Sequence, residues 1–259
     1  MGSEYWLRHW EPLRAGFVMG WQDFITLGRG SRLGKWWPTI GLAIRVTFVG
    51  LVLALVLGAR SPDYIPWLAT GWTAWGMISS AITGTSGTMN RNRGLMLTLQ
   101  TPKEAFIVKV IVKEIALLVQ NLLVVLGVLI AFRVTVTYAV LLLIPGLLIT
   151  AAFLYGLGMI IAPLSAKYKD LVPFISAITG VMFFVLPIMW QPQLIESGLA
   201  RQILGLNPLY HYLQVVRLPL LSEVPTGLNY LLTGTGAIAV LVIGMLVMRK
   251  TRNKIVYWI

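Results

Sequence analysis

The chain has 259 residues, of which 57% are hydrophobic and only 12% are charged, and its formal net charge is +12. Soluble domains carry roughly 25% charged residues, so this composition indicates an integral membrane protein. The sequence contains no cysteine and only two histidines, which excludes a disulfide framework, a thiol nucleophile and a histidine-rich metal site.

Residues 1–37 are expected to form a cytoplasmic segment that lies against the membrane. Trp6, Trp10, Leu13 and Phe17 recur at helical spacing. This pattern predicts an amphipathic helix in the plane of the interface.

The stretch that follows has several glycines and a Gly34-Lys35 pair, and it superficially resembles a phosphate-binding loop. A Walker A loop needs a glycine where Arg29 stands and a serine or threonine where Trp36 stands, so this is not a nucleotide site. Cations followed by indoles are instead typical of a juxtamembrane belt. The expected interfacial anchors are Trp6, Trp10, Arg29, Arg32, Lys35, Trp36 and Trp37.

Residues 38–259 are expected to form an all-α transmembrane domain. A helix needs about 20 apolar residues to cross the hydrocarbon core, and lipid admits only segments whose backbone is paired internally. Six apolar runs meet the length, and they predict six spans at about 38–57, 64–86, 105–131, 138–163, 171–190 and 228–248.

The distribution of positive charge predicts the orientation of these spans. Most of the 21 Lys and Arg residues fall in the N-terminal segment, the loops after spans two and four, and the C-terminal tail. Only Arg60, Arg133, Arg201 and Arg217 fall on the other side. The positive-inside rule then places both termini in the cytoplasm and explains the net charge without a nucleic-acid partner.

Between spans two and three, residues 91–100 are expected to form a short cytoplasmic helix that a partner can grip. Thr101, Pro102 and Glu104 have the spacing of a helix capping box and predict where span three begins. Lys109 and Lys113 lie on one face of that span. They are expected to anchor it by extending toward the lipid head groups.

Residues 191–227 form a long connection between spans five and six. Two pieces, 194–206 and 208–221, are too short to cross a membrane and predict two short helices that re-enter it or lie on its surface. Asn207 can cap the second helix, and Pro208 can open it. Either an exit gate or a packing cap fits this pattern.

Aromatic residues inside or near the spans could form a track for a sugar polymer, because sugar rings have apolar faces that stack on aromatic rings. Packing between helices is the alternative role for each. The candidate path residues are Phe48, Trp72, Trp75, Phe183, Phe184, Trp190, Tyr210 and Tyr212.

Four short segments occur in order along nearly the whole chain. They are Ser31, Leu33, Gly34 and Trp37; Leu95, Met96, Pro102, Lys103 and Glu104; Lys167, Tyr168, Lys169 and Asp170; and Pro187, Pro192, Asn207, Pro208 and Leu209. This set resembles the membrane subunit of type-2 ABC exporters, in the branch that exports O-antigen, capsule and teichoic acid. Thr101 stands where that family usually has phenylalanine, and lysines replace several of its arginines.

The resemblance implies a channel-forming subunit in the bacterial inner membrane that moves a lipid-linked polysaccharide. It implies a homodimer with two copies of a separate ABC ATPase, which binds the ATP and Mg, while this chain holds no cofactor or metal and is not an enzyme. The residues that dock on the ATPase would be Arg91, Asn92, Arg93, Tyr168, Lys169 and Asp170.

Three other functions are compatible with parts of the sequence. The cargo of the same machine could be a drug or a small lipid. A proton-coupled secondary transporter would need an ionisable group in a span, such as Glu114. A rhomboid-like protease is suggested by Gly84–Gly87, but Ser86 would need a histidine within hydrogen-bond reach.

Overall fold

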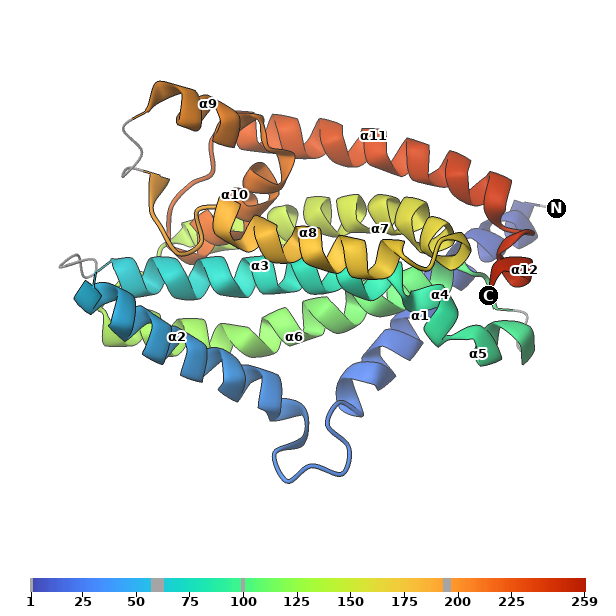
Figure 1. The fold of residues 1–259 in the computed structure, drawn as a ribbon, viewed down its shortest axis with the longest axis horizontal. Coiled ribbons are helices and arrows are strands. Elements are labelled where there is room, and N and C mark those ends of the chain that lie inside the picture. The colour runs from blue at the N-terminus through green and yellow to red at the C-terminus, as the bar shows by residue number, and fades with distance from the viewer. Residues whose placement is uncertain (1, 57–62, 99–100, 193–196) are drawn as a thin grey trace.

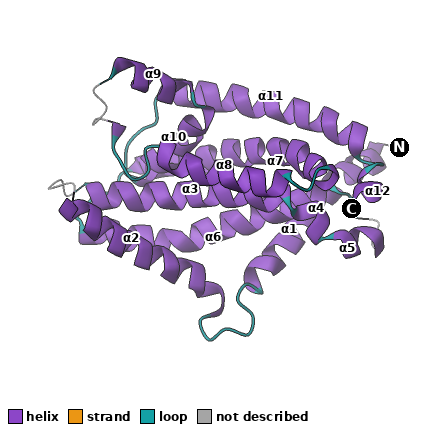
Figure 2. Ribbon diagram, viewed as in Figure 1, coloured by secondary structure: helices purple, strands orange, loops and turns teal. Residues whose placement is uncertain are grey.

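The computed structural model describes residues 2–56, 63–98, 101–192 and 197–259, with side chains described from Glu11 onward except Ala54, Val56 and Ala200. Every regular element in these ranges is helical (Figure 2), as the sequence predicts. The elements are α1 (Gly2–Ile25), η1 (Gly34–Trp36), α2 (Trp37–Val56), α3 (Tyr64–Ser86), α4 (Thr88–Arg91), α5 (Arg93–Thr98), α6 (Glu104–Ala131), η2 (Tyr138–Leu142), α7 (Leu143–Lys167), α8 (Leu171–Val185), α9 (Gly198–Leu206), α10 (Pro208–Leu220), α11 (Gly227–Thr251) and α12 (Ile255–Trp258).

Helix α3 lies at the centre of the bundle. It packs against α2, α6, α7, α8 and α10, and most of its residues are buried. In Figure 1 it runs horizontally, with α6 on one side and α7 and α8 on the other, while α11 packs on the far side of α7. The main core is built from apolar side chains of α3, α6, α7 and α10.

Polar residues in α3 fit this central place because they bond to the helix itself. Thr70, Thr73 and Thr85 are buried, and each hydroxyl donates to the carbonyl four residues earlier, at 2.8 Å. A hydroxyl satisfied in this way can be buried at little cost. The polar side chains therefore lower the hydropathy of α3 without excluding it from the core.

Four helical segments of the described chain are long and apolar enough to cross a membrane: Gly34–Leu53, Glu104–Ala131, Tyr138–Lys167 and Gly227–Thr251. Helix α3 is less apolar than these, for the reason just given. Helix α8 has only 15 residues, which is about 22 Å.

The expected fifth span to residue 190 is therefore too long as a helix. Helix α8 ends at Val185, and Leu186 is extended (φ −76°, ψ 147°) because the next residue is Pro187. The expected end of the fourth span at residue 163 is too early, since α7 continues past Pro163 to Lys167.

Helix α1 packs along α6 through a face that includes two glycines. A Cβ atom at Gly20 would lie 2.9 Å from Cβ of Val112, and one at Gly16 would lie 2.7 Å from the carbonyl oxygen of Ala105. Two glycines four residues apart let helices approach closely. Leu13 and Phe17, from the predicted apolar stripe, are 41% and 56% exposed, and Phe17 borders a hollow that α6 also lines.

The predicted capping box before α6 does not form. Helix α6 begins at Glu104 with Lys103 as its N-cap, and no side chain caps it. Glu104 faces Arg252 instead, with 3.8 Å between Oε1 and Nε. Further along, Asn207 does cap α10, because its Oδ1 accepts from the Leu209 amide at 3.0 Å.

Candidate functional site

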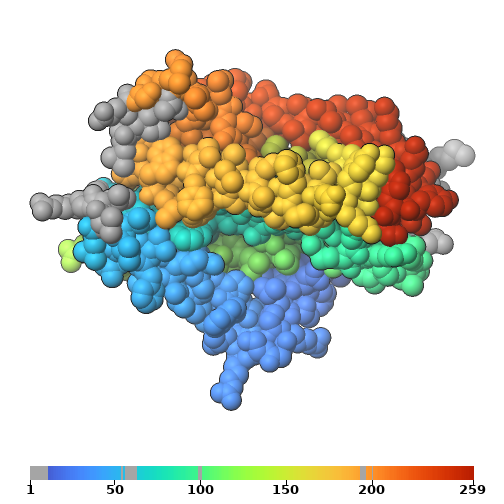
Figure 3. Space-filling model, in the orientation of Figure 1, coloured from blue at the N-terminus to red at the C-terminus, as the bar shows by residue number. Residues whose placement is uncertain are grey.

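One face of α3 is partly exposed, and its residues are small, polar or aromatic. Trp72, Gly76, Ser79, Ser80 and Thr83 recur on one face of the helix, while the residues around them are buried. Together with α8 this stripe lines a hollow of about 300 Å³. Figure 3 shows α8 on the outer surface of the molecule, across α3. From α8 the hollow receives Ser176, Thr179, Gly180 and Phe183.

The hollow presents rings and hydroxyl acceptors to anything that enters it. Trp72 and Phe183 contact each other, with ring centroids 5.1 Å apart. The Thr83 hydroxyl donates to the Ser79 carbonyl at 2.9 Å, and the Thr179 hydroxyl donates to the Ile175 carbonyl at 2.9 Å. A hydroxyl that donates to its own helix keeps lone pairs free to accept, so this surface can receive hydrogen bonds from a ligand's hydroxyls.

A second hollow of about 270 Å³ lies beside the first, between α2, α3 and α6. Arg45 borders it, with its guanidinium carbon 5.8 Å from the Trp72 ring centroid. Glu114 also borders it and is paired with Lys113, whose Nζ lies 2.9 Å from Oε1. Lys113 therefore neutralises the carboxylate within the protein rather than only extending to lipid.

The candidate path aromatics do not all lie together. Trp72, Trp75 and Phe183 line the first hollow, although Trp75 is itself buried. Phe48 of α2 and Phe184 of α8 are 66% and 68% exposed on the outer surface.

The three path candidates near the expected exit have separate environments. Tyr212 lies in the core, stacked on Phe153 at 4.0 Å, because α10 packs inward against α7 and α11. It is therefore not at a surface that a polymer could contact. Tyr210 accepts a hydrogen bond from Gln214, and Trp190 donates to the Phe184 carbonyl.

The turn after α8 is held by three side chains that converge on its backbone. Tyr64 and Trp67 of α3 donate to the carbonyls of Met189 at 2.8 Å and Trp190 at 3.2 Å. Arg217 of α10 donates to the carbonyl of Pro187 at 2.7 Å. This carbonyl clamp, residues Tyr64, Trp67 and Arg217, fixes the end of α8 to α3 and α10.

Arg217 is fully buried in this clamp, which is unusual for a charged side chain. Its guanidinium carbon lies 4.0 Å from the Trp67 ring centroid, and the absence of a side chain at Gly71 gives the guanidinium its space. Burial lowers the pKa of Arg217 to about 9, so the group stays charged at neutral pH. The Trp67 ring thus stabilises a cation that water does not reach.

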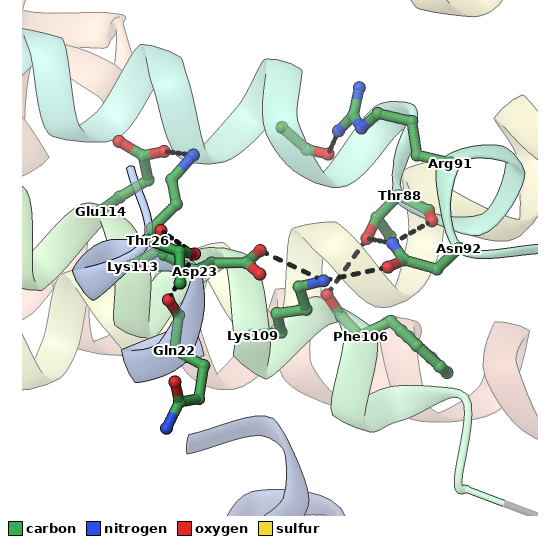
Figure 4. A network of polar contacts seen from close by, with 11 residues as sticks. Gln22, Asp23, Thr26, Thr88, Arg91, Asn92, Phe106, Lys109, Lys113 and Glu114 are labelled. Carbon is green, nitrogen blue, oxygen red and sulfur yellow. Dashed lines mark hydrogen bonds and ion pairs between the residues drawn. The ribbon is translucent and has the colours of Figure 1, made fainter. Parts of the chain in front are cut away.

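A polar network joins three elements at the opposite end of α3 (Figure 4). Lys109 of α6 has its Nζ 3.1 Å from a carboxylate oxygen of Asp23 in α1 and donates to the Oδ1 of Asn92 at 3.0 Å. Asn92 in turn donates to the Thr88 carbonyl at 2.7 Å. Lys109 therefore links α1 to the α4–α5 turn and is not simply a lipid anchor.

The residues expected to dock on an ATPase lie at this same end, on two adjacent elements. The Arg91 guanidinium folds back and donates to the Gly84 carbonyl, and Asn92 belongs to the network above, whereas Arg93 is exposed. Lys169 and Asp170 are exposed in the turn between α7 and α8. Tyr168, in the same turn, is 53% exposed, with Lys167 Nζ 4.8 Å from its ring centroid.

The expected interfacial anchors surround the connection between α1 and α2. Arg29 and Arg32 are exposed there, and Trp36 and Trp37 are 44% and 61% exposed. Lys35 lies over the Phe24 ring, 5.5 Å from its centroid. The side chains of Trp6 and Trp10 lie outside the described part of the chain.

The serine and the histidine that a rhomboid-like site would need are not together. The Ser86 hydroxyl donates to the Thr83 carbonyl at 2.7 Å, at the end of α3 next to α4. His211 is buried in α10, at the other end of the bundle (Figure 1), between Asn229 Oδ1 and the Gly205 carbonyl, both at 2.8 Å. The side chain of the second histidine, His9, lies outside the described residues.

Sequence reasoning missed Asp23, Arg217 and the hydroxyl stripe of α3. The Gly16 to Gly20 spacing could have indicated that α1 packs on a helix and so brings Asp23 to Lys109. The recurrence of Gly76, Ser79, Ser80 and Thr83 on one helix face was also visible. Nothing in the sequence indicated that Arg217 is buried over Trp67.

Comparisons with known proteins show which family the chain resembles in sequence. The family profile described as "ABC-2 type transporter" matches residues 14–221. The chain is also 24% identical over 182 residues to the O-antigen export system permease protein RfbA of Myxococcus xanthus, which covers 70% of each chain.

Proposed function

Because the chain belongs to the ABC-2 type transporter family, we propose that it is the channel-forming membrane subunit of an ATP-driven exporter of a lipid-linked polysaccharide. The hydroxyl-and-aromatic hollow between α3 and α8 carries this proposal. Its rings suit the apolar faces of sugars, and its hydroxyl acceptors suit their OH groups. The relative from Myxococcus xanthus, named as an O-antigen export permease, supports the same class of cargo.

The proposed topology has six spans with both termini in the cytoplasm of a bacterial inner membrane. The four long apolar segments are joined by α3 and α8, which lie beside them in the bundle. Helix α8 alone is too short to cross the hydrocarbon core. The turn after α8, which the carbonyl clamp holds, would extend it across the rest of the core. Arg93 at the start of α5, Arg249 and Lys250 in the last turn of α11, and Lys254 just before α12 then face the cytoplasm, as the positive-inside rule requires.

We propose that two copies of the chain face each other across α2, α3 and α8. This side carries exposed apolar residues of α2 and α8, including Phe48, Phe174 and Phe184, together with the α3 hollow. Pairing would enclose the hollows of two copies between them. An enclosed, polar-lined path through protein is the kind of passage that lets a hydrophilic polymer cross lipid.

Two copies of a separate ABC ATPase are proposed to bind ATP and Mg and to dock on α5 and on the turn at Tyr168–Asp170. Arg93, Lys169 and Asp170 are exposed at this end. Movement of α5 would reach the bundle through Asn92 and Lys109, and it would reach α1 through Asp23. Closure of the ATPases can then shift the helices between two packings.

Size-graded blocking of a single cysteine tests the path. The chain has no cysteine, so Ser80→Cys introduces one thiol at the hollow. We expect export of surface polysaccharide to survive a small thiol reagent and to stop after a bulky one. Ile238→Cys is the matched control, because Ile238 is 65% exposed on α11, away from the hollow. Equal inhibition of both variants would contradict the proposed path.

The same export assay also tests the two alternative functions, a different cargo and a different energy source. If polysaccharide export is unaffected while efflux of a drug or a short lipid stops, the path stands and the cargo is different. Export that resists vanadate but collapses with the proton gradient would instead indicate a secondary transporter with Glu114 in its pathway.

A further inference from the structure

A hollow of about 730 Å³ belongs to none of the regions above. It lies between α1, α6, α7 and α11, at the end of the bundle that holds α5 and α12 (Figure 1). This is the side of α6 and α7 away from the α3–α8 hollow. Its volume is in the range of sites that bind small molecules.

The lining of this hollow carries both signs of charge. Arg249 and Arg252 border it from the end of α11, and Glu11 and Glu104 border it from α1 and α6. Arg252 only partly neutralises Glu104, because its Nε is 3.8 Å from Oε1, beyond hydrogen-bond distance. The other carboxylate oxygen of Glu104, Oε2, is buried and has no hydrogen-bond partner among the described residues.

A buried carboxylate oxygen without a donor is costly, so it favours a ligand that brings one. A ligand with only negative charge would suit the two arginines, but it would be repelled by Glu104 and Glu11. A ligand with only positive charge would meet the reverse problem. The lining therefore fits a molecule that carries an ammonium and a phosphate close together.

The apolar part of the lining indicates that the ligand also carries hydrocarbon. Met159, Met245 and Met248 form one wall, and Met245 is 44% exposed toward the outside of the bundle. Methionine side chains adapt to flexible hydrocarbon. The charged side chains lie at the cytoplasmic end of the hollow, and the methionines line a wall that opens to the outside of the bundle. This arrangement suits a lipid whose head group lies among the charges and whose acyl chain lies along the methionines.

We propose that this hollow binds the head group of a glycerophospholipid with a primary ammonium, such as phosphatidylethanolamine, from the cytoplasmic leaflet. The ammonium donates to Oε2 of Glu104, the phosphate lies against Arg249 and Arg252, and the upper acyl chain lies along Met245 and Met248. The bound lipid thus ties α11 to α6 and α1. The proposal rests on the chain lying in a membrane and not on the identity of the exported cargo.

Competitive lipid binding by the purified full chain tests this proposal. The protein in detergent is mixed with short-chain phosphatidylethanolamine, phosphatidylcholine or phosphatidylglycerol, and bound lipid is counted by native mass spectrometry. We expect phosphatidylethanolamine to bind at least about tenfold more tightly than the other two, because only its ammonium has N–H donors for Glu104. Equal binding of phosphatidylethanolamine and phosphatidylcholine would overturn the proposal.

Variants assign the contacts. Glu104→Gln should remove the preference for phosphatidylethanolamine over phosphatidylglycerol, and Arg249→Gln with Arg252→Gln should weaken the binding of both lipids. Glu223→Gln and Lys250→Gln are the matched controls, because neither residue lines the hollow, and they should leave binding unchanged. Size-exclusion chromatography and circular dichroism check that each variant folds. A Glu104→Gln variant that folds and keeps the preference contradicts the assignment.

One further arm separates a lipid from a soluble ligand of the same chemistry. Free phosphoethanolamine should compete only at concentrations at least tenfold higher, because it lacks the hydrocarbon that contacts the methionines. If it binds as tightly as the lipid, the proposed lipid site is wrong. Neither result depends on export, so failure here leaves the proposed function standing.

Discussion

At the scale of single residues, the least expected feature is a buried arginine whose guanidinium contacts an aromatic ring and donates to a backbone carbonyl. Arg217 stacks on Trp67 and donates to Pro187, and it thereby ties α10 to the turn after α8. An ammonium cannot reproduce a planar guanidinium that stacks and donates at the same time. The side chain therefore has a structural role: it holds α10 against the turn after α8.

Replacing this arginine with lysine tests that role. Arg217→Lys keeps the charge but loses the stacking, and we expect it to cost about 1–3 kcal/mol of stability. Thermal unfolding in detergent, followed by tryptophan fluorescence, measures the loss. Arg32→Lys, at an exposed position in the α1–α2 connection, should leave the transition unchanged. Equal shifts in both variants would show that the stacking contributes nothing.

Lys109 is the second residue whose role differs from the expectation. It contacts Asp23 and Asn92 at once, so Lys109→Met breaks the link between α1, α6 and the α4–α5 turn. We expect the variant to assemble with the ATPase but to export several-fold less polysaccharide per ATP hydrolysed. Parallel assays of phosphate release and surface polysaccharide measure this ratio.

Lys254→Met controls for the loss of a positive charge, because Lys254 is exposed between α11 and α12. It should keep the wild-type ratio. If Lys109→Met also exports normally per ATP, the network has no part in coupling.

At the scale of elements, the contact between α1 and α6 depends on two missing side chains. Gly20→Val would place a branched side chain against Val112 and the Lys109 carbonyl, and we expect it to lift α1 off α6. Faster hydrogen exchange in α1 and loss of the Asp23–Lys109 contact should follow. Gly127→Ala is the control, because a Cβ at Gly127 in α6 meets nothing within 4 Å. Unchanged exchange in the Gly20→Val variant would show that α1 is held by other contacts.

The elements also show what the sequence could and could not predict. The bounds of α3 and α11 follow closely from apolar runs, because a membrane helix must satisfy its own backbone. The end of α8 at Val185 depends on Pro187, which the apolar run conceals. Thr101 fails as a cap because α6 begins later, at Glu104.

The site was harder to predict than the fold. Trp72 and Phe183 were predicted because aromatic residues stand out in a span, and the structure places their ring centroids 5.1 Å apart. The serines and threonines around them carry no such signal, since a hydroxyl in a membrane helix bonds to its own backbone equally well in a packed interface. The burial of Tyr212 and Arg217 could not be predicted from the sequence, because it depends on how α10 packs against the other helices.

At the scale of the whole molecule, the proposed function divides the work between this chain, which would form the passage, and a separate ATPase, which would supply the energy. Its sequence has no Walker loop, and we expect the purified chain to release no phosphate from ATP. Polysaccharide export should require an added ABC ATPase, stop with vanadate and survive a protonophore. Measurable ATP turnover by the chain alone would contradict this division of labour.

The central claim is that α5 and the Tyr168–Asp170 turn face the cytoplasm, where an ATPase can push them. Single cysteines at Arg93, Lys169 and Glu223 test it directly, because the natural chain has none and all three positions are exposed. With a thiol reagent that cannot cross membranes, intact cells should label only the cysteine at position 223, and everted vesicles should label those at 93 and 169. Labelling of positions 93 and 169 from outside intact cells would contradict the account.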